Sequence, residues 1–172
     1  GYIWSTRMEE QKKKMEAATE GTKVSVTQTA DNQLKLNVPS DISFDTGQST
    51  IKPEMLPVLN SLAAGLKSNS NSQAIIIGYT DDTGNDSINN PLSVNRAAST
   101  RAYLVSQGIA FNRISIDGRG ASEPVAANTS PENRAKNRRV EIFVKEPQPQ
   151  QQRQQELPQH QDQQQYIQQP AY

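Results

Sequence analysis

The chain has 172 residues, of which 33% are hydrophobic and 5% aromatic, and its formal net charge at pH 7 is zero. This length suits one domain of ordinary size with polar ends, and the balanced charge gives no general reason to expect nucleic acid or an anionic membrane as a partner. The chain has no cysteine, and its single histidine, His160, lies in a glutamine-rich tail, which excludes disulfides, thiolate chemistry, a Ser-His-Asp triad and a histidine zinc site in the core.

The amino-terminal segment, residues 1–21, is predicted to lie outside the folded domain. Residues 5–20, STRMEEQKKKMEAATE, are rich in helix formers and precede Gly21, which favours a helix end. Because apolar positions are sparse here, we expect a solvated linker helix. The chain starts without methionine and has no run of about 20 apolar residues, so we interpret its start as a processed or truncated end and expect a signal peptide or membrane anchor upstream.

The central part, residues 22–146, is predicted to fold as one α/β domain. Five segments rich in β-forming residues are expected to be strands: 22–29, 33–38, 73–79, 113–117 and 138–145. Helical spacing of leucines predicts a helix from Pro53 to Leu66, and Asn90-Pro91 predicts the start of another that ends at Gly108. Helices that alternate with strands indicate a sheet covered by helices on one face. Periodicity leaves open whether that sheet is mixed.

The carboxyl-terminal segment, residues 147–172, is dominated by glutamine and proline. Such a composition buries too little apolar surface to offset the entropy lost on ordering, so we expect a disordered tail. An inert extension is favoured over an interaction segment on composition alone.

Polar side chains gather in GYTDDTGNDSINNPLSVNRA, residues 78–97, at the junction of a predicted strand and helix. Asp81 follows the carboxyl end of the strand, where ligands bind in open α/β sheets. Arg96 follows in the helix, fifteen positions later. One carboxylate and one guanidinium near a helix amino terminus suit a zwitterion, whose ammonium would bind Asp81 and whose carboxylate would bind Arg96. From spacing alone, a simple ion pair between the two is favoured over a ligand site, because surface pairs are common.

The direction of the Arg96 side chain can be predicted from helical geometry. We expect the buried face of this helix to carry Val94, Ala98 and Val105, which fall close together at about 100° per residue. Arg96 lies about 200° from Val94 and is expected to face away from the core.

Other chemistries find less support. A calcium loop starting at Asp81 would need glycine and glutamate where the chain has Asp86 and Leu92. There is no dinucleotide or phosphate-binding glycine motif. Carboxylates for a glycosidase are available, but nothing places two of them across a sugar: Asp81, Asp82, Asp86 and Glu123. The basic residues 134–139 have no aromatic neighbours, which is not typical of a nucleic-acid surface. We therefore expect no enzyme activity, no cofactor and no metal.

Four separated motifs carry a resemblance to a known family. Residues 78–97, with RAYLVSQGI, RISIDGRGASEPVAAN and NRAKNRRVEI, resemble the OmpA-like peptidoglycan-binding domain, which also occurs in the peptidoglycan-associated lipoprotein and MotB. FDTGQSTIKPE is similar to the opening segment of that family. The resemblance covers about residues 34–144, and the amino-terminal layout is similar to outer-membrane lipoproteins of the YiaD type.

The resemblance implies an α/β sandwich, βαβαββ in outline, with helices packed on a mixed sheet. It also implies a ligand, the peptidoglycan stem peptide with its meso-diaminopimelate residue. The family's key aspartate and arginine fall on Asp81 and Arg96. Four further family positions near the ligand fall on Thr80, Asn89, Leu92 and Arg138. The motif match, and not the spacing, favours the ligand site over a simple ion pair.

We therefore expect a periplasmic, outer-membrane-associated protein that binds peptidoglycan and tethers an outer-membrane protein to the cell wall through an upstream anchor. Two alternatives stay open. One is a periplasmic scaffold that recruits a protein partner through its tail, and the other, less favoured, is a peptidoglycan hydrolase. The chain also departs from the family pattern at Gly47, where some members have an asparagine near the ligand.

Overall fold

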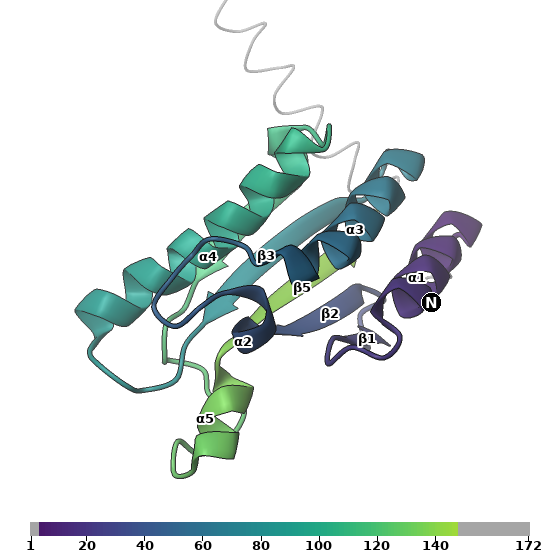
Figure 1. Ribbon diagram of the computed structural model, residues 1–172. Helices are drawn as coiled ribbons and strands as arrows, with labels where there is room; N and C mark the ends of the chain where they lie inside the picture. The colour runs from purple at the N-terminus through teal and green to yellow at the C-terminus, as the bar shows by residue number, and fades with distance from the viewer. Residues whose placement is uncertain (1–3, 148–172) are drawn as a thin grey trace, which may run out of the picture.

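A five-stranded mixed sheet forms the centre of the computed structural model, which describes residues 4–147 (Figure 1). Its strands are β1 (Ser25–Gln28), β2 (Leu34–Pro39), β3 (Gln73–Tyr79), β4 (Ile114–Gly118) and β5 (Arg139–Lys145). They are arranged in the order β1-β2-β5-β3-β4. The pair β3–β4 is parallel and all other pairs are antiparallel, so the mixed sheet that the family resemblance implies is confirmed.

The helical elements surround this sheet. They are α1 (Thr6–Thr19), α2 (Ser40–Ser43), η1 (Pro53–Met55), α3 (Leu56–Ser68), α4 (Asp86–Ser106), η2 (Phe111–Arg113) and α5 (Pro131–Asn137). Figure 1 shows α3 and α4 along one face of the sheet, as the alternation of elements predicts, and α1 beside α3. No helix within residues 4–147 is long and apolar enough to cross a membrane.

The core lies between the sheet and these helices. The last strand of the chain, β5, enters the middle of the sheet and places Ile142 between Leu36 of β2 and Ile76 of β3. All three side chains are fully buried. Because alternate residues of a strand point to the same face, β2, β3 and β5 each contribute a row of apolar side chains to one core. Leucines of α3 cover this row, which explains their helical spacing.

The expectation of a solvated amino-terminal helix was wrong. In α1, Met8 and Met15 are buried in the core, and Gln11 is also buried. The helix packs along α3, and the Gln11 side chain accepts a 2.9 Å hydrogen bond from Asn69 Nδ2 at the carboxyl end of α3. The buried face of α1 is narrow and half of its side chains are polar, so a search for apolar residues did not identify it.

The second long helix also starts earlier than predicted. It begins at Asp86, because the side chain of Asn85 accepts a hydrogen bond from the amide of Ile88 at 3.2 Å and caps the helix there. Pro91 consequently lies inside α4, where it lacks the N–H that would close the first turns. Two short helices, α2 and α5, form in segments for which no strand or helix was predicted. The predicted disordered tail lies almost entirely outside the described residues.

Candidate ligand site

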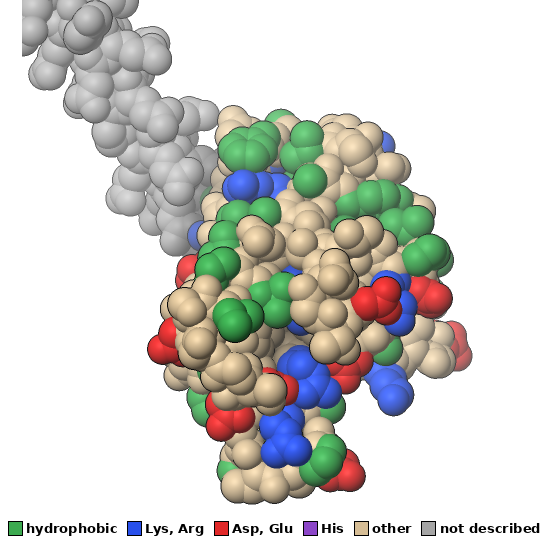
Figure 2. Space-filling model, turned by 60° about the vertical axis from the view of Figure 1, so that its left-hand side comes forward, with side chains coloured by type: hydrophobic (Ala, Val, Ile, Leu, Met, Phe, Trp, Pro, Cys, Tyr) green, Lys and Arg blue, Asp and Glu red, His purple; other side chains and the backbone are tan. Residues whose placement is uncertain are grey.

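A pocket of about 560 Å³ opens beside the first turns of α4. It is lined from three segments: the turn and loop after β2 (Asp41, Phe44, Asp45, Thr46 and Gly47), the junction of β3 and α4 (Thr80, Asp81, Thr83, Ile88, Asn89, Leu92 and Arg96), and Arg138 before β5. Its volume is in the range of small-molecule sites. On the face shown in Figure 2, basic and acidic side chains lie close together around a hollow above the part of the surface that α5 forms.

Asp81 is held at the inner wall of this pocket. Its side chain is buried, and Oδ1 accepts a 2.8 Å hydrogen bond from the amide of Thr83. Oδ2 accepts a 2.5 Å charged hydrogen bond from Nη1 of Arg138. Burial alone would raise the pKa of the Asp81 carboxyl, but the Thr83 amide and the Arg138 guanidinium outweigh it and lower that pKa. Asp81 is therefore an anion at neutral pH.

Arg96 is buried in the same pocket but forms no ion pair with an acidic side chain of residues 4–147. Its side chain donates from Nε to the carbonyl oxygen of Gln48 at 2.8 Å and from Nη2 to that of Asp45 at 3.3 Å. The guanidinium also lies 5.0 Å from the centre of the Phe44 ring. Within residues 4–147, no carboxylate oxygen lies within 4.0 Å of its nitrogens. Burial lowers the pKa of Arg96. Among the described residues, the site therefore contains a buried cation that no carboxylate contacts directly.

The predicted direction of Arg96 was wrong. The buried face of α4 carries Ser93, Arg96, Ala97 and Thr100, together with Asn89 and Leu104. Val94 and Val105, expected in the core, are 39% and 36% exposed. Small polar side chains face the sheet because helix and strand approach closely: a Cβ on Gly78 of β3 would lie 2.2 Å from the Ser93 carbonyl oxygen. An analysis that counts only apolar residues misses such a face.

Arg138 connects two acidic side chains across the pocket. Besides its bond to Asp81, it forms a bidentate pair with Asp41 of α2, with Nε–Oδ1 and Nη2–Oδ2 distances of 2.9 Å. This pairing raises the pKa of Arg138, and the hydrogen bonds from Arg138 lower the pKa of Asp41. Sequence reasoning missed Asp41. It lies 97 positions from its partner, outside the predicted strands and helices, and no local pattern indicated the pair.

The three remaining predicted residues also line the pocket. Asn89 Nδ2 donates to the carbonyl oxygen of Thr83 at 3.0 Å, which ties the loop after β3 to the first turns of α4. The Thr80 hydroxyl donates to the Asp81 carbonyl oxygen at 2.9 Å. Leu92 contributes an apolar, partly exposed wall. All six predicted residues are thus brought together, and their role toward a ligand stays a prediction.

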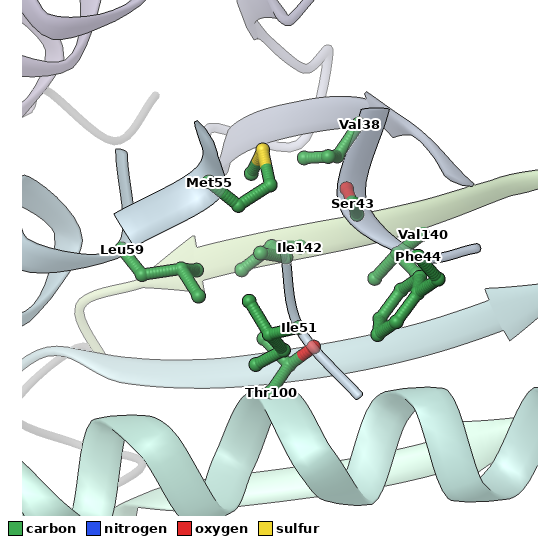
Figure 3. A pocket seen from close by; sticks show the side chains of 9 residues that line it. All are labelled: Val38, Ser43, Phe44, Ile51, Met55, Leu59, Thr100, Val140 and Ile142. Atoms are coloured by element: carbon green, nitrogen blue, oxygen red, sulfur yellow. The ribbon is translucent and has the colours of Figure 1, made fainter. Parts of the chain in front are cut away.

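Two other features of the described chain do not form comparable sites. An apolar cavity beneath α2, whose lining side chains point toward one another in Figure 3, has a volume of about 10 Å³. This is the size of one water probe, so the cavity is packing space. Among residues 4–147, no three His, Cys, Asp or Glu side chains are placed to hold a metal ion. Glu123, one of the candidate glycosidase carboxylates, pairs with Arg119 at 2.8 Å on the surface and lies outside the pocket.

The sequence model of the OmpA family matches residues 43–138, more than half of the chain and the whole of this site except Asp41. The chain belongs to the OmpA family. Among OmpA-family relatives, it is 40% identical over 137 residues to the probable lipoprotein YiaD of Escherichia coli, a match that covers 80% of this chain and 62% of YiaD.

Two further proteins are similar to more than half of the chain. The peptidoglycan-binding protein ArfA of Mycobacterium tuberculosis is 42% identical over 117 residues, which cover 67% of this chain and 36% of ArfA. The structure of the cell wall anchor of the type VI secretion system from Pseudomonas aeruginosa matches with a TM-score of 0.70 and 27% identity, over 79% of this chain and 97% of that one. The chain thus spans less than two thirds of either curated relative.

Proposed function

We propose that this OmpA-family domain binds peptidoglycan, without cleaving it, by holding the free zwitterionic end of a diaminopimelate residue in the stem peptide. The observation that carries this proposal is the buried Arg96 guanidinium, which has no direct counter-ion in the described part of the chain and shares a pocket with the ionised Asp81. A buried charge is costly unless it is paired. An anionic group of a ligand would supply the missing partner.

The geometry supports a division of roles between the two side chains. Within residues 4–147, the Arg96 side chain donates through Nε and Nη2, so both hydrogens of Nη1 remain for a ligand carboxylate. The Asp81 carboxylate accepts from the Thr83 amide at Oδ1 and from Arg138 at Oδ2, and hydrogen bonding by the Thr83 side chain also lowers its pKa. Because an ionised carboxylate has about four lone-pair sites, it keeps acceptor capacity for an ammonium. Thr80, Asn89 and Leu92 shape the wall between them, and Arg138 lies beside Asp81. The similarity to ArfA, a peptidoglycan-binding protein, and to a cell wall anchor of the type VI secretion system supports the same ligand class.

The biological role that follows is a tether between the cell wall and the outer membrane. A periplasmic wall-binding domain joined to an upstream anchor would hold the two layers together by non-covalent contact. The similarity to the probable lipoprotein YiaD and to outer membrane protein A of Bordetella avium supports this location.

Three synthetic stem peptides would test the proposal by calorimetry on the full chain. One contains diaminopimelate, one contains lysine and so lacks the distal carboxylate, and one contains 2-aminopimelate and so lacks the distal ammonium. We expect saturable binding of the first and at least tenfold weaker binding of the other two. The lysine peptide offers the buried Arg96 no carboxylate, and the 2-aminopimelate peptide forms no charged hydrogen bond to Asp81. Equal affinity for all three peptides would contradict the proposal that Asp81 and Arg96 each bind one charge of the ligand. Incubation with purified sacculi should release no muropeptides, and their release would contradict the non-enzymatic role.

A further inference from the structure

The bridge that Arg138 forms between Asp41 and Asp81 raises a question about the proposed ligand. An ammonium can bind Asp81 only where Arg138 does not already occupy that carboxylate. Arg138 donates a single hydrogen bond to Asp81, through Nη1. Its parallel donors, Nε and Nη2, are both directed at Asp41.

This division is informative because a guanidinium prefers a bidentate pair with one carboxylate. Without a second acidic side chain, Arg138 would be free to turn this fork toward Asp81 and cover both of its oxygens. Asp41 accepts these two parallel hydrogen bonds instead. The side chain of Asp41 is 53% exposed and that of Asp81 only 9%, so Asp41 is the outer partner and Asp81 the inner one.

The backbone fixes the same arrangement. The amide of Ser40, the first residue of α2, donates to the carbonyl oxygen of Arg138 at 2.9 Å. One turn of chain therefore holds both the main chain and the side chain of Arg138. The segment that follows α2 supplies the carbonyl oxygens of Asp45 and Gln48 that hold Arg96. Asp41 thus lies in the segment that holds both Arg138 and Arg96 by hydrogen bonds.

We propose that Asp41 is a positioning residue that sets the ligand specificity of the site. By binding Nε and Nη2 of Arg138, Asp41 keeps the Asp81 carboxylate available to a ligand cation. This inference rests on the proposed function, because it assigns the means by which the Asp81 side of the clamp stays available. It concerns the ammonium and not the carboxylate of the ligand. Asp41 acts through Arg138 and needs no contact with the ligand.

The variant Asp41→Asn, with Asp82→Asn as its matched control, tests this directly. Both substitutions remove one negative charge, but Asp82 is exposed and does not line the pocket. With Asp41→Asn, we expect affinity for the diaminopimelate peptide to fall about tenfold, a usual size for coupled charged neighbours. Affinity for the 2-aminopimelate peptide, which has no ammonium to compete with Arg138, should change less than about twofold. Asp82→Asn should leave both affinities within about twofold.

A second background separates positioning from direct contact. In Arg138→Gln, the competing cation is gone, so adding Asp41→Asn should have no further effect on binding of the diaminopimelate peptide. Persistence of the full loss in that background would overturn the inference, since Asp41 would then bind the ligand itself. An equal loss for both peptides would overturn it too, because general damage to the site does not distinguish them. Wild-type protein that binds none of the peptides would overturn the proposed function together with the inference, whereas wild-type binding that Asp41→Asn leaves intact would overturn the inference alone.

Discussion

Asp81 and Arg96 line one pocket, but each is held by a different part of the chain. The Asp81 carboxylate accepts from the Thr83 amide and from Arg138, whereas the Arg96 guanidinium donates to two backbone carbonyl oxygens. The simple ion pair that their spacing favoured is therefore not what the structure contains. Two opposite charges kept apart, each on its own support, form a site that suits a ligand carrying both charges.

The first prediction concerns Asp81→Asn, which keeps the shape of the side chain and its acceptor for the Thr83 amide. Because the substitution leaves the ligand ammonium without a counter-ion, binding of the diaminopimelate peptide should weaken by about 2 kcal/mol or more. Asp82→Asn, at an exposed neighbouring position, is the matched control and should leave affinity unchanged. Calorimetry of both variants measures the difference. Asp81→Asn protein that binds as tightly as Asp82→Asn protein would rule out this carboxylate as the cation site.

The second prediction concerns Arg96→Lys, which keeps the charge but not the planar fork. A lysine ammonium cannot reproduce both carbonyl bonds and also hold a carboxylate in the bidentate geometry. We expect at least tenfold weaker binding of the diaminopimelate peptide and reduced discrimination against the lysine peptide. Arg101→Lys is the control, because Arg101 lies on the same helix but stacks on Phe111, outside the pocket. Discrimination that survives Arg96→Lys would show that another group reads the ligand carboxylate.

These site residues show how far the sequence alone could lead. The motif match placed all six predicted side chains in one pocket, because a motif records which residues meet in the fold. Helical periodicity misplaced Arg96, since the buried face of α4 uses Ser93 and Thr100 where an apolar stripe was expected. Asp41 was not found at all. Its pairing with Arg138 depends on β2 and β5 lying side by side, a relationship that no local pattern contains.

The third prediction is a pH dependence of stability that Asp81 and Asp41 cause. Both carboxyls have a pKa lowered below the ordinary value of 3.8 in the folded state. The unfolded chain therefore binds more protons than the folded one in the window below about 3.8, and stability falls as the pH drops through the folded pKa. Urea unfolding between pH 7 and 2.5 should show this loss. In the Asp81→Asn variant, the unfolding free energy should fall less steeply with pH than in wild type. The difference in unfolding free energy between variant and wild type should therefore become smaller at low pH. Parallel curves would mean that Asp81 does not contribute.

The fourth prediction concerns Gly78→Ala, at the closest approach of β3 and α4. The added Cβ would lie 2.2 Å from the carbonyl oxygen of Ser93 and 2.9 Å from its carbon, both backbone atoms that cannot turn aside. Unfolding free energy should fall by about 1–3 kcal/mol or more. Gly65→Ala offers a contrast, because its Cβ would meet a side-chain atom, Gln11 Cγ, at 3.1 Å, a milder overlap than the backbone clash at Gly78, and alanine favours a helix. Urea denaturation compares the two. Equal costs would indicate that α4 can shift away from the sheet.

The fold was predicted well where periodicity is strong and poorly where packing is polar. All five strands and the helix from Pro53 were found at or near their observed bounds, because β-branched runs and leucine spacing bury apolar side chains in a regular pattern. The amino-terminal helix has the spacing of a packed helix, but half of its buried stripe is polar: Gln11 and Thr19 alternate with Met8 and Met15. Those side chains are buried because hydrogen bonds satisfy them, as with Asn69 for Gln11.

The last prediction tests this helix. Met8→Ala removes a fully buried side chain from the contact of α1 with the core, which should lower the unfolding free energy by about 2–5 kcal/mol. Lys13→Ala, on the exposed face of the same helix, should change it by less than about 0.5 kcal/mol. Because α1 contributes no residue to the pocket, both variants should bind the diaminopimelate peptide with unchanged affinity while they remain folded. If Met8→Ala were as neutral as Lys13→Ala, α1 would not be packed in solution, and a domain that starts after residue 21 would be as stable as the longer chain.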